Sequence, residues 1–304
     1  MDLLQLLERR QVSLYLVAIA AGVLLGAVAP PVAPALEPAV EPAIAALLLV
    51  TFHGIPLTRL RAGLADGRFL VTLLAVNLLA VPVIVAALTL PLRDSPDLLI
   101  GALLVLLAPC IDYVVVFTAL ARGAHEKLLA ATPLLMLGQI LALPVLLPLL
   151  GGGAATAAID PVPFLRALVL LVLLPLLAAA LLQRLVPRLD LAPAMVPLMI
   201  LVLLAVTASQ TPRALGAGGA LLALVPVYAA FLVLATGAGL LIARLLRLDG
   251  RAATAVTFSG ATRNSLVVLP LALAMPTPLA PAAVVTQTLV ELVGMVVLVR
   301  VLSR

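Results

Sequence analysis

Apolar runs long enough to cross a lipid bilayer recur along the whole chain. A helix needs about 20 residues to span roughly 30 Å of hydrocarbon. Hydrophobic residues make up 65% of the 304 positions and charged residues 10%. Stretches such as 220–246 lack the alternating polarity of a membrane β-strand. The sequence therefore predicts an all-α polytopic membrane protein with ten spans, at residues 11–30, 41–57, 69–90, 98–121, 127–150, 163–183, 193–210, 219–243, 251–275 and 279–300.

The distribution of basic residues predicts the orientation. If the N-terminus is inside, fourteen of the eighteen Lys and Arg residues fall on the cytoplasmic side and three on the outer side. Both termini are then cytoplasmic, and the first apolar run is a retained helix rather than a signal peptide. The basic charge borders lipid and forms no groove for nucleic acid. One lysine against seventeen arginines is typical of a GC-rich genome, so we expect a bacterial plasma (inner) membrane.

Three charged residues fall deep inside the predicted spans, namely Asp112, Arg263 and Glu291. Each costs roughly 2.5–3.5 kcal/mol on insertion scales unless it is paired or hydrated. Function is therefore expected at these residues.

The ten predicted spans divide into two halves of five, residues 1–152 and 153–304. An odd number of spans in each half inverts the second half relative to the first. A shift of 152 residues aligns Cys110 with Thr262, Asp112 with Asn264, and Gln139 with Glu291. This pattern predicts two inverted repeats, with broken fourth and ninth helices that cross at the midplane.

Each of these two spans contains a polar interruption. In the fourth, Pro109 removes a backbone hydrogen bond, so a break near residues 105–112 is expected, although a simple proline kink is an alternative. The ninth is interrupted by small and polar residues around Arg263, from which we predict a break at Ser259 and Gly260 that extends through Thr262 and Asn264. Freed amides and carbonyls at two such breaks would form a polar cradle.

The tenth span places Gln287, Thr288 and Glu291 on one helical face, at spacings of three and four residues. We predict an ion-coupling role for Glu291 and Gln287. Alternatively, Glu291 is only the counter-ion of Arg263, and Gln287 forms an interhelical hydrogen bond.

These segments resemble the arsenite efflux permeases of the bile acid/arsenite/riboflavin transporter superfamily. The resemblance rests on Ala-Pro-Cys at 108–110, the Ser/Thr/Asn-rich segment 259–265 and Leu-Val-Glu-Leu-Val at 289–293, and it covers essentially the whole chain. It implies an exchanger that expels trivalent arsenic, sometimes antimony, through a membrane cysteine at Cys110 and a membrane glutamate at Glu291. The implied fold has a panel of spans 1, 2, 6 and 7 and a core of spans 3–5 and 8–10.

The chemistry of these residues agrees with that implication. Trivalent arsenic is thiophilic, and a lone cysteine offers one reversible sulfur ligand. Cysteine also packs well as a small residue, which is the alternative for Cys110. We expect Cys110, Thr262, Arg263 and Asn264 to bind substrate and Glu291, whose apolar setting favours protonation, to carry a proton. Neither a cofactor nor a metal centre is expected beyond Cys110 as an arsenic ligand.

Asp112 and Arg263 depart from the pattern of the arsenite permeases. Asp112 is assigned to ion coupling, and a pair between it and Arg263 would tie the two broken helices together. Alternatively, Arg263 forms part of a site for an anionic substrate.

The main rival function is sodium- or proton-coupled transport of an organic anion, as in the bile acid branch. A guanidinium that keeps its proton repels a nearby sodium ion, which favours protons as the coupling ion. His53 and His125 lie outside any catalytic or metal-binding pattern, so an enzyme is not predicted, while a channel is conceivable. The expected partners are a small-molecule or metalloid substrate, protons and the lipid bilayer, and the oligomeric state is left open.

Overall fold

The computed structural model describes residues 3–54, 66–110, 113–158, 162, 166, 168–216, 218–275, 277 and 279–302. These residues form helices, and the only extended pairing among them is an isolated bridge between Pro109 and Arg263. Asp112, for which an ion-coupling role was predicted, lies outside the described residues. The chain divides into two compact units, Met1–Pro56 with Pro161–Gly218, and Leu57–Asp160 with Gly219–Arg304. We call them unit 1 and unit 2.

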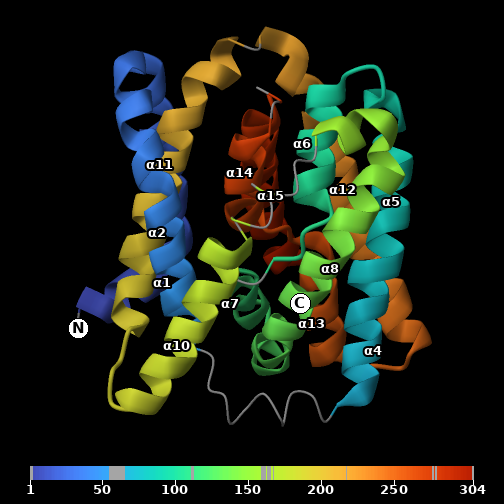
Figure 1. Ribbon diagram of the computed structural model, residues 1–304. Helices are drawn as coiled ribbons and strands as arrows, with labels where there is room; N and C mark the ends of the chain where they lie inside the picture. Colours follow the sequence, from blue (N-terminus) through green and yellow to red (C-terminus); the bar gives the residue numbers. More distant parts are fainter. Residues whose placement is uncertain are drawn as a thin grey trace. The chain divides into compact units, whose positions relative to one another are not determined.

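Unit 1 is a bundle of long helices (Figure 1). Its main helices are α1 (Leu3–Val28), α2 (Ala33–His53), α10 (Leu174–Leu185) and α11 (Ala192–Gly216), with short helical segments at Pro30–Val32 and Leu168–Leu173. Gly22 and Gly26 let α1 approach α11, since an added Cβ would lie 1.9 Å from Thr207 Oγ1 and 2.5 Å from the Ala208 carbonyl oxygen, respectively. This is the small-residue packing typical of membrane helices.

Two of the polar contacts in unit 1 lie near helix ends. Gln183 donates from Nε2 to the carbonyl oxygen of His53 at 2.8 Å, which caps the end of α2. Arg213 forms a two-bonded ion pair with Glu37, with distances of 3.0 and 3.1 Å. Both side chains are partly exposed, so unit 1 keeps this ion pair at its surface.

Unit 2 contains the predicted spans three to five and eight to ten. One continuous helical rod consists of α4 (Gly67–Ala75), the π-helical segment η2 (Val76–Ala80) and α5 (Val81–Leu88). The short turn Leu90–Leu92 leads to α6 (Pro96–Leu106), which is followed by α7 (Tyr113–Leu120) and α8 (His125–Ala158). The second part of unit 2 begins at Gly219, within the short helical segment Gly218–Ala223, and continues with α12 (Leu224–Leu245), α13 (Gly250–Ala261), α14 (Ser265–Ala274) and α15 (Ala280–Leu302).

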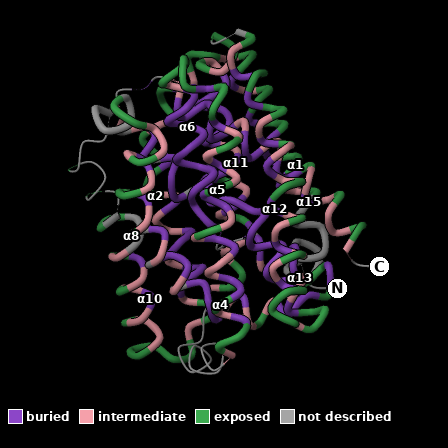
Figure 2. Tube along the Cα trace, turned by 90° about the vertical axis from the view of Figure 1, so that its right-hand side faces the viewer, coloured by how far each residue is buried: buried purple, intermediate pink, exposed green. Residues whose placement is uncertain are grey.

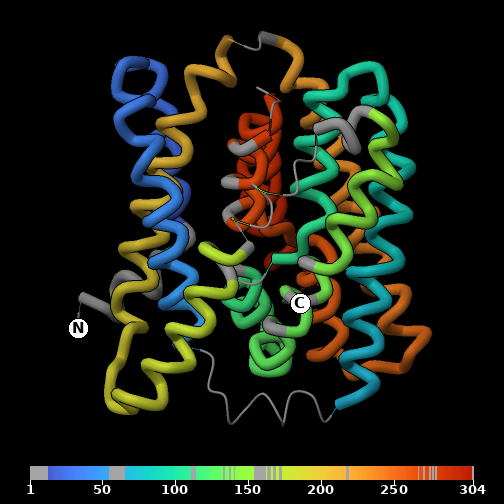
Figure 3. Tube along the Cα trace, viewed as in Figure 1, coloured from blue at the N-terminus to red at the C-terminus, as the bar shows by residue number. Residues whose placement is uncertain are grey.

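Two helices of unit 2, α6 and α13, are each too short to span a bilayer. At 1.5 Å per residue, the 11 residues of α6 and the 12 of α13 extend only about 16–18 Å. Each is followed by an interruption and a second short helix. Figure 3 colours these elements by their place in the chain. The residues of α6 from Leu98 onward are buried, and they form a purple stretch of the trace in Figure 2.

The described helices overlap the predicted spans, although α1 and α2 begin eight residues earlier than predicted, α8 ends eight residues later and α11 six residues later. Six helical stretches among the described residues are long and apolar enough to cross a membrane: Pro30–His53, Gly67–Leu88, Leu134–Gly153, Ala192–Gly216, Gly219–Leu245 and Ala280–Leu302. Shorter apolar helices cover Ser13–Val28, Pro96–Leu106 and Leu174–Leu185. The chain is therefore an all-helical membrane protein, and the count of ten crossings stays a prediction.

Candidate functional site

The two interruptions of unit 2 pair with each other. The backbone N–H of Asn264 donates to the carbonyl of Ala108 at 2.7 Å, and the N–H of Cys110 donates to the carbonyl of Thr262 at 3.4 Å. Pro109 and Arg263 face each other in this short antiparallel bridge. Backbone groups that leave a helix inside an apolar core need new partners. Here each interruption supplies the partners of the other.

The second interruption begins later than the sequence predicted. Ser259 and Gly260 lie in the last turn of α13, and the chain becomes extended only at Thr262, with φ −96° and ψ 144°. The prediction of a break at Ser259 and Gly260 is therefore wrong. The helix continues because its terminal carbonyls are satisfied, in part by the Thr262 hydroxyl, which donates to the Phe258 carbonyl at 2.7 Å. Pro109, in contrast, lies in the non-helical segment after α6.

The guanidinium of Arg263 contacts the carboxyl ends of both short helices. Nη2 donates to the carbonyls of Ser259 and Gly260 at 2.7 Å each, at the end of α13. Nη1 donates to the carbonyl of Leu106 at 3.3 Å, at the end of α6. The carboxyl end of a helix carries a partial negative charge. Arg263 therefore neutralises two helix ends at once, and its side chain is completely buried.

Two further side chains contact this guanidinium. Asn77 Oδ1 accepts from Arg263 Nη2 at 3.0 Å, while Asn77 Nδ2 donates to Ser259 Oγ at 3.0 Å. The ring of Phe231 lies with its centroid 5.4 Å from the guanidinium carbon, within the range of a cation–π interaction. The site set predicted from the sequence did not include either residue. Asn77 had a signal, a lone amide within an apolar span, but Phe231 had none.

Asn77 reaches the site from the π-helical segment η2. Such segments are common at functional sites, because the extra residue per turn redirects side chains. Gly260 allows the close approach of this segment, since an added Cβ would lie 2.6 Å from Val76 Cγ1. The π-segment therefore brings an amide to the end of α13.

Glu291 approaches the second interruption from α15. Its Oε2 atom accepts the backbone N–H of Arg263 at 2.7 Å and a short hydrogen bond from Nε2 of Gln287. Glu291 is completely buried and Gln287 almost so. Gln287 and Glu291 therefore lie on the same face of α15, as predicted, and form a hydrogen bond. Thr288, the third residue of that face, donates instead to the Val284 carbonyl of its own helix at 3.2 Å.

Cys110 and Glu291 bind opposite ends of one peptide group. The Thr262 carbonyl accepts from Cys110 N–H, and the Arg263 N–H of the same peptide donates to Glu291. Cys110 is 1% exposed. The backbone N–H of Cys110 and the carboxylate of Glu291 are therefore linked through a single peptide plane.

Asn264 begins α14 as its N-cap residue. Its side-chain oxygen accepts from the backbone N–H of Val267 at 3.1 Å. Its Nδ2 atom and the hydroxyl of Ser265 are buried and have no hydrogen-bond partner among the described residues. The amino end of α14 therefore presents two buried polar groups able to donate hydrogen bonds, where the helix dipole is positive.

Comparison with known families decides the class. A model of the SBF-like CPA transporter family, which is bile acid:sodium symporter-like, matches residues 14–297. The chain belongs to this family. A search of curated proteins found no match. Membership in the SBF-like CPA transporter family makes the chain a membrane transporter, and the matched region contains both interruptions and Glu291. This match confirms the predicted relation to the bile acid symporters.

Proposed function

We propose that this chain is a proton-coupled secondary transporter that expels trivalent arsenic from a bacterial cell by alternating access. Arsenite is the expected substrate, with antimonite or an organoarsenical as related cargo. The proposal includes ten spans in two inverted repeats, 1–152 and 153–304, with the panel in unit 1 and the core in unit 2. The observation that carries it is the peptide group held between Cys110 and Glu291.

The proposed coupling runs through that peptide group. An ionised Glu291 accepts the Arg263 N–H strongly, because hydrogen bonds to charged acceptors are about twice as strong as neutral ones. A proton on Glu291 weakens this bond and loosens the Thr262–Arg263 peptide. The same peptide accepts from Cys110. Protonation at Glu291 thus alters the segment that holds the thiol, and substrate at the thiol alters the proton site.

Arsenic chemistry suits a single thiol. The sulfur of Cys110 replaces one hydroxyl of arsenous acid, so that an As–S bond forms and the thiol proton leaves with the hydroxyl as water. Attack by water reverses the step and releases the substrate. One soft ligand binds trivalent arsenic reversibly, whereas three would retain it.

The position of Arg263 argues against sodium as the coupling ion. The carbonyls of Leu106, Ser259 and Gly260 and the amide oxygen of Asn77 form an all-oxygen set of the kind that hard cations prefer. A guanidinium that never loses its proton already occupies this set. The coupling ion is then a proton carried by Glu291.

Everted membrane vesicles that contain the protein test the proposal. Arsenite uptake is measured in sodium-free buffer with an acid interior, and the expected result is accumulation that a protonophore abolishes. Cys110→Ala and Cys110→Ser are compared, because serine keeps a small polar side chain without sulfur. Loss in both variants supports a thiol ligand. Full activity of Cys110→Ser, or a strict requirement for sodium, would overturn the proposal.

A second candidate, proton-coupled transport of an organic anion, is favoured by one observation. Asn264 Nδ2 and the Ser265 hydroxyl, which have no hydrogen-bond partner in the described part of the chain, form a donor pair at the amino end of α14 that suits a carboxylate. Under this alternative, the vesicles take up a radiolabelled organic acid and no arsenite. The double variant Asn264→Asp with Ser265→Ala would abolish that uptake.

A further inference from the structure

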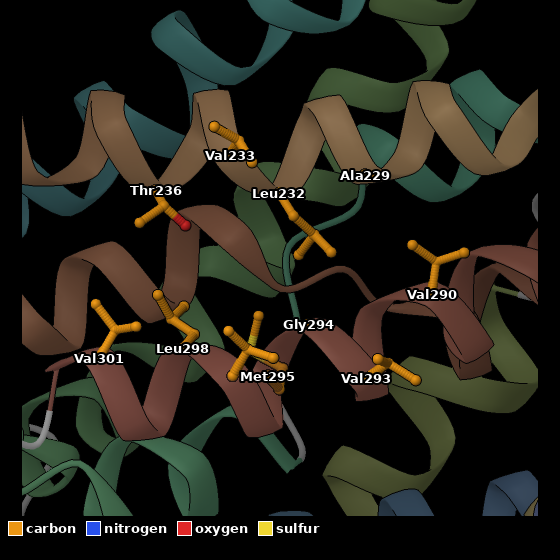
Figure 4. Close-up of a pocket in the computed structure, with 11 residues that line it drawn as sticks. Ala229, Leu232, Val233, Thr236, Val290, Val293, Gly294, Met295, Leu298 and Val301 are labelled. Carbon is orange, nitrogen blue, oxygen red and sulfur yellow. The ribbon is translucent and has the colours of Figure 1, made fainter.

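Helices α12 and α15 of unit 2 enclose an apolar groove of about 420 Å³ (Figure 4). Val233 and Thr236 line it from α12, and Val293, Gly294, Val297 and Val301 line it from α15. Gly294 sets the depth of the groove, since an added Cβ would lie 2.5 Å from Leu232 Cδ1. Along α15 the lining extends from Val290 to Val301, which is roughly 16 Å at 1.5 Å per residue.

The rim of the groove faces outward from unit 2. Val233 is 71% exposed, Val293 63% and Val297 55%. Side chains of this kind face hydrocarbon in a membrane protein, where exposed apolar surface carries no penalty. The groove length matches one leaflet, because half of a hydrocarbon core of about 30 Å is about 15 Å.

One end of the groove is flanked by arginine. Arg244 and Arg300 lie in the last turns of α12 and α15, and both are exposed. Arg244 follows Val233 by eleven residues and Arg300 follows Val293 by seven, close to three and two whole helical turns. Each arginine therefore continues the stripe of valines that lines the groove. Neither has an ion-pair partner among the residues that the structure describes.

We propose that this groove binds an anionic phospholipid, with one acyl chain along the valines and the phosphate at Arg244 and Arg300. Guanidinium groups bind phosphate through paired hydrogen bonds, and clustered basic residues at a helix end attract anionic lipids. A second copy of the chain is a poorer occupant. A two-fold axis along the membrane normal would bring four arginines of like charge to the same end of the interface.

Native mass spectrometry of the detergent-purified full chain tests this site. The first probe is the endogenous phospholipid that the protein retains after purification. The second is a mixture of phosphatidylglycerol and phosphatidylcholine, added at equal concentration. We expect one anionic lipid per chain and preference for phosphatidylglycerol. The variant Arg244→Gln/Arg300→Gln should reduce retention roughly 25-fold, since each of the two basic residues near the headgroup contributes a factor of about five. Val233→Phe/Val297→Phe, which fills the groove, should also reduce it.

Matched controls isolate the groove. Arg184→Gln/Arg188→Gln removes two exposed arginines of unit 1, and Val71→Phe/Val83→Phe adds two phenylalanines at exposed positions on α4 and α5. Both controls should retain lipid as the unchanged chain does, and circular dichroism melting checks that every variant is folded. Equal retention by all variants would overturn the proposal. So would a chain that binds no lipid, or a dimer that becomes monomeric only in the groove variants.

Discussion

The two units differ in the burial of their charged side chains and in the continuity of their helices. In unit 1 the described helices α1, α2 and α11 each run without a non-helical break, threonines such as Thr207 and Thr211 bond back to carbonyls of their own helix, and the Arg213–Glu37 pair is partly exposed. In unit 2 two helices are interrupted, and both Arg263 and Glu291 are completely buried. An intact helix satisfies its own amides and carbonyls, so it needs no internal charge. An interrupted helix leaves helix ends that attract charges of opposite sign.

The sorting of charge within unit 2 follows this rule. The guanidinium of Arg263 contacts carbonyl ends, at Leu106, Ser259 and Gly260, while Glu291 accepts a backbone N–H just before α14. Burial of each ion costs several kcal/mol, which hydrogen bonds only partly offset. Apolar helices like those of unit 1 would be as stable without such ions. Their presence in unit 2 therefore argues for a transport role of this site.

The largest expected effect comes from Arg263→Gln. A single amide cannot satisfy three carbonyls and the Asn77 side chain, so we expect the unfolding free energy to fall by about 3–5 kcal/mol. Transport should be lost. Thermal unfolding in detergent and vesicle uptake measure both effects. Arg213→Gln, which breaks the partly exposed pair of unit 1, is the control and should cost less than about 1 kcal/mol. Equal losses in the two variants would remove the proposed difference between the units.

Glu291→Gln should abolish the coupling of transport to the proton gradient without destabilising the fold. The glutamine side-chain oxygen still accepts the Arg263 N–H, so the melting temperature should change little. The side chain can no longer carry a proton, so gradient-driven accumulation should fall to the level of vesicles without the transporter. Counterflow exchange without a gradient should persist and lose its pH dependence. Thr288→Val is the control, because that hydroxyl bonds only within α15 in the described structure. Retained proton-driven accumulation in Glu291→Gln would exclude this residue as the sole proton carrier.

Hydropathy predicted the helices of both units better than it predicted the site. Runs of about 20 apolar residues locate spans because every backbone group must be satisfied inside lipid. Pro109 located the first interruption for the same reason, since proline lacks an N–H. Periodicity also placed Gln287 beside Glu291, and the hydrogen bond between them is present. These inferences depend on local chain geometry, which the sequence carries directly.

The remaining site depends on contacts between distant segments. The carbonyl of Leu106 and the ring of Phe231 meet Arg263 only because the end of α6 and part of α12 lie beside the second interruption. Backbone acceptors have no signature in the sequence. Ser259 and Gly260 were wrongly assigned to the break, because small polar residues favour an interruption unless a cation caps their carbonyls. Arg263 supplies that cation, four residues after Ser259 and three residues after Gly260.

A smaller effect is expected from Gly22→Ala in unit 1. The new Cβ would lie 1.9 Å from Thr207 Oγ1 and 2.7 Å from the Leu204 carbonyl, so α1 and α11 must separate. Overpacking of this kind costs about 1–3 kcal/mol. Thermal unfolding should show the loss, whereas the pH dependence of transport stays unchanged in the protein that remains folded. Gly237→Ala, with no atom within 4 Å of the new Cβ, is the control and should not destabilise. A shifted pH profile in Gly22→Ala would mean that proton coupling is not confined to unit 2.

The smallest effect is expected from the ion pair at a helix end of unit 2. Lys127 Nζ lies 2.7 Å from Asp66 Oδ2, and the two side chains are 33% and 35% exposed. The hydrogen bond from Lys127 lowers the pKa of Asp66, and the bond to Asp66 raises the pKa of Lys127. Solvent screens a pair this exposed, so its contribution to stability should be below about 1 kcal/mol and should shrink in high salt.

The directions of these two pKa shifts set the pH window of the pair. The stabilisation from Asp66 is complete above its ordinary pKa of 3.8 and is lost as pH falls through the lowered value. That from Lys127 is complete below 10.5 and is lost as pH rises through the raised value. Between about pH 5 and 9 both groups stay charged. Asp66→Asn keeps an N-cap for the Phe69 amide, so it should lower the melting temperature slightly and equally across that range. Because this exposed pair cannot titrate there, the pH dependence of transport should survive in Asp66→Asn, and its loss in Glu291→Gln would assign it to the carboxyl beside the interruption.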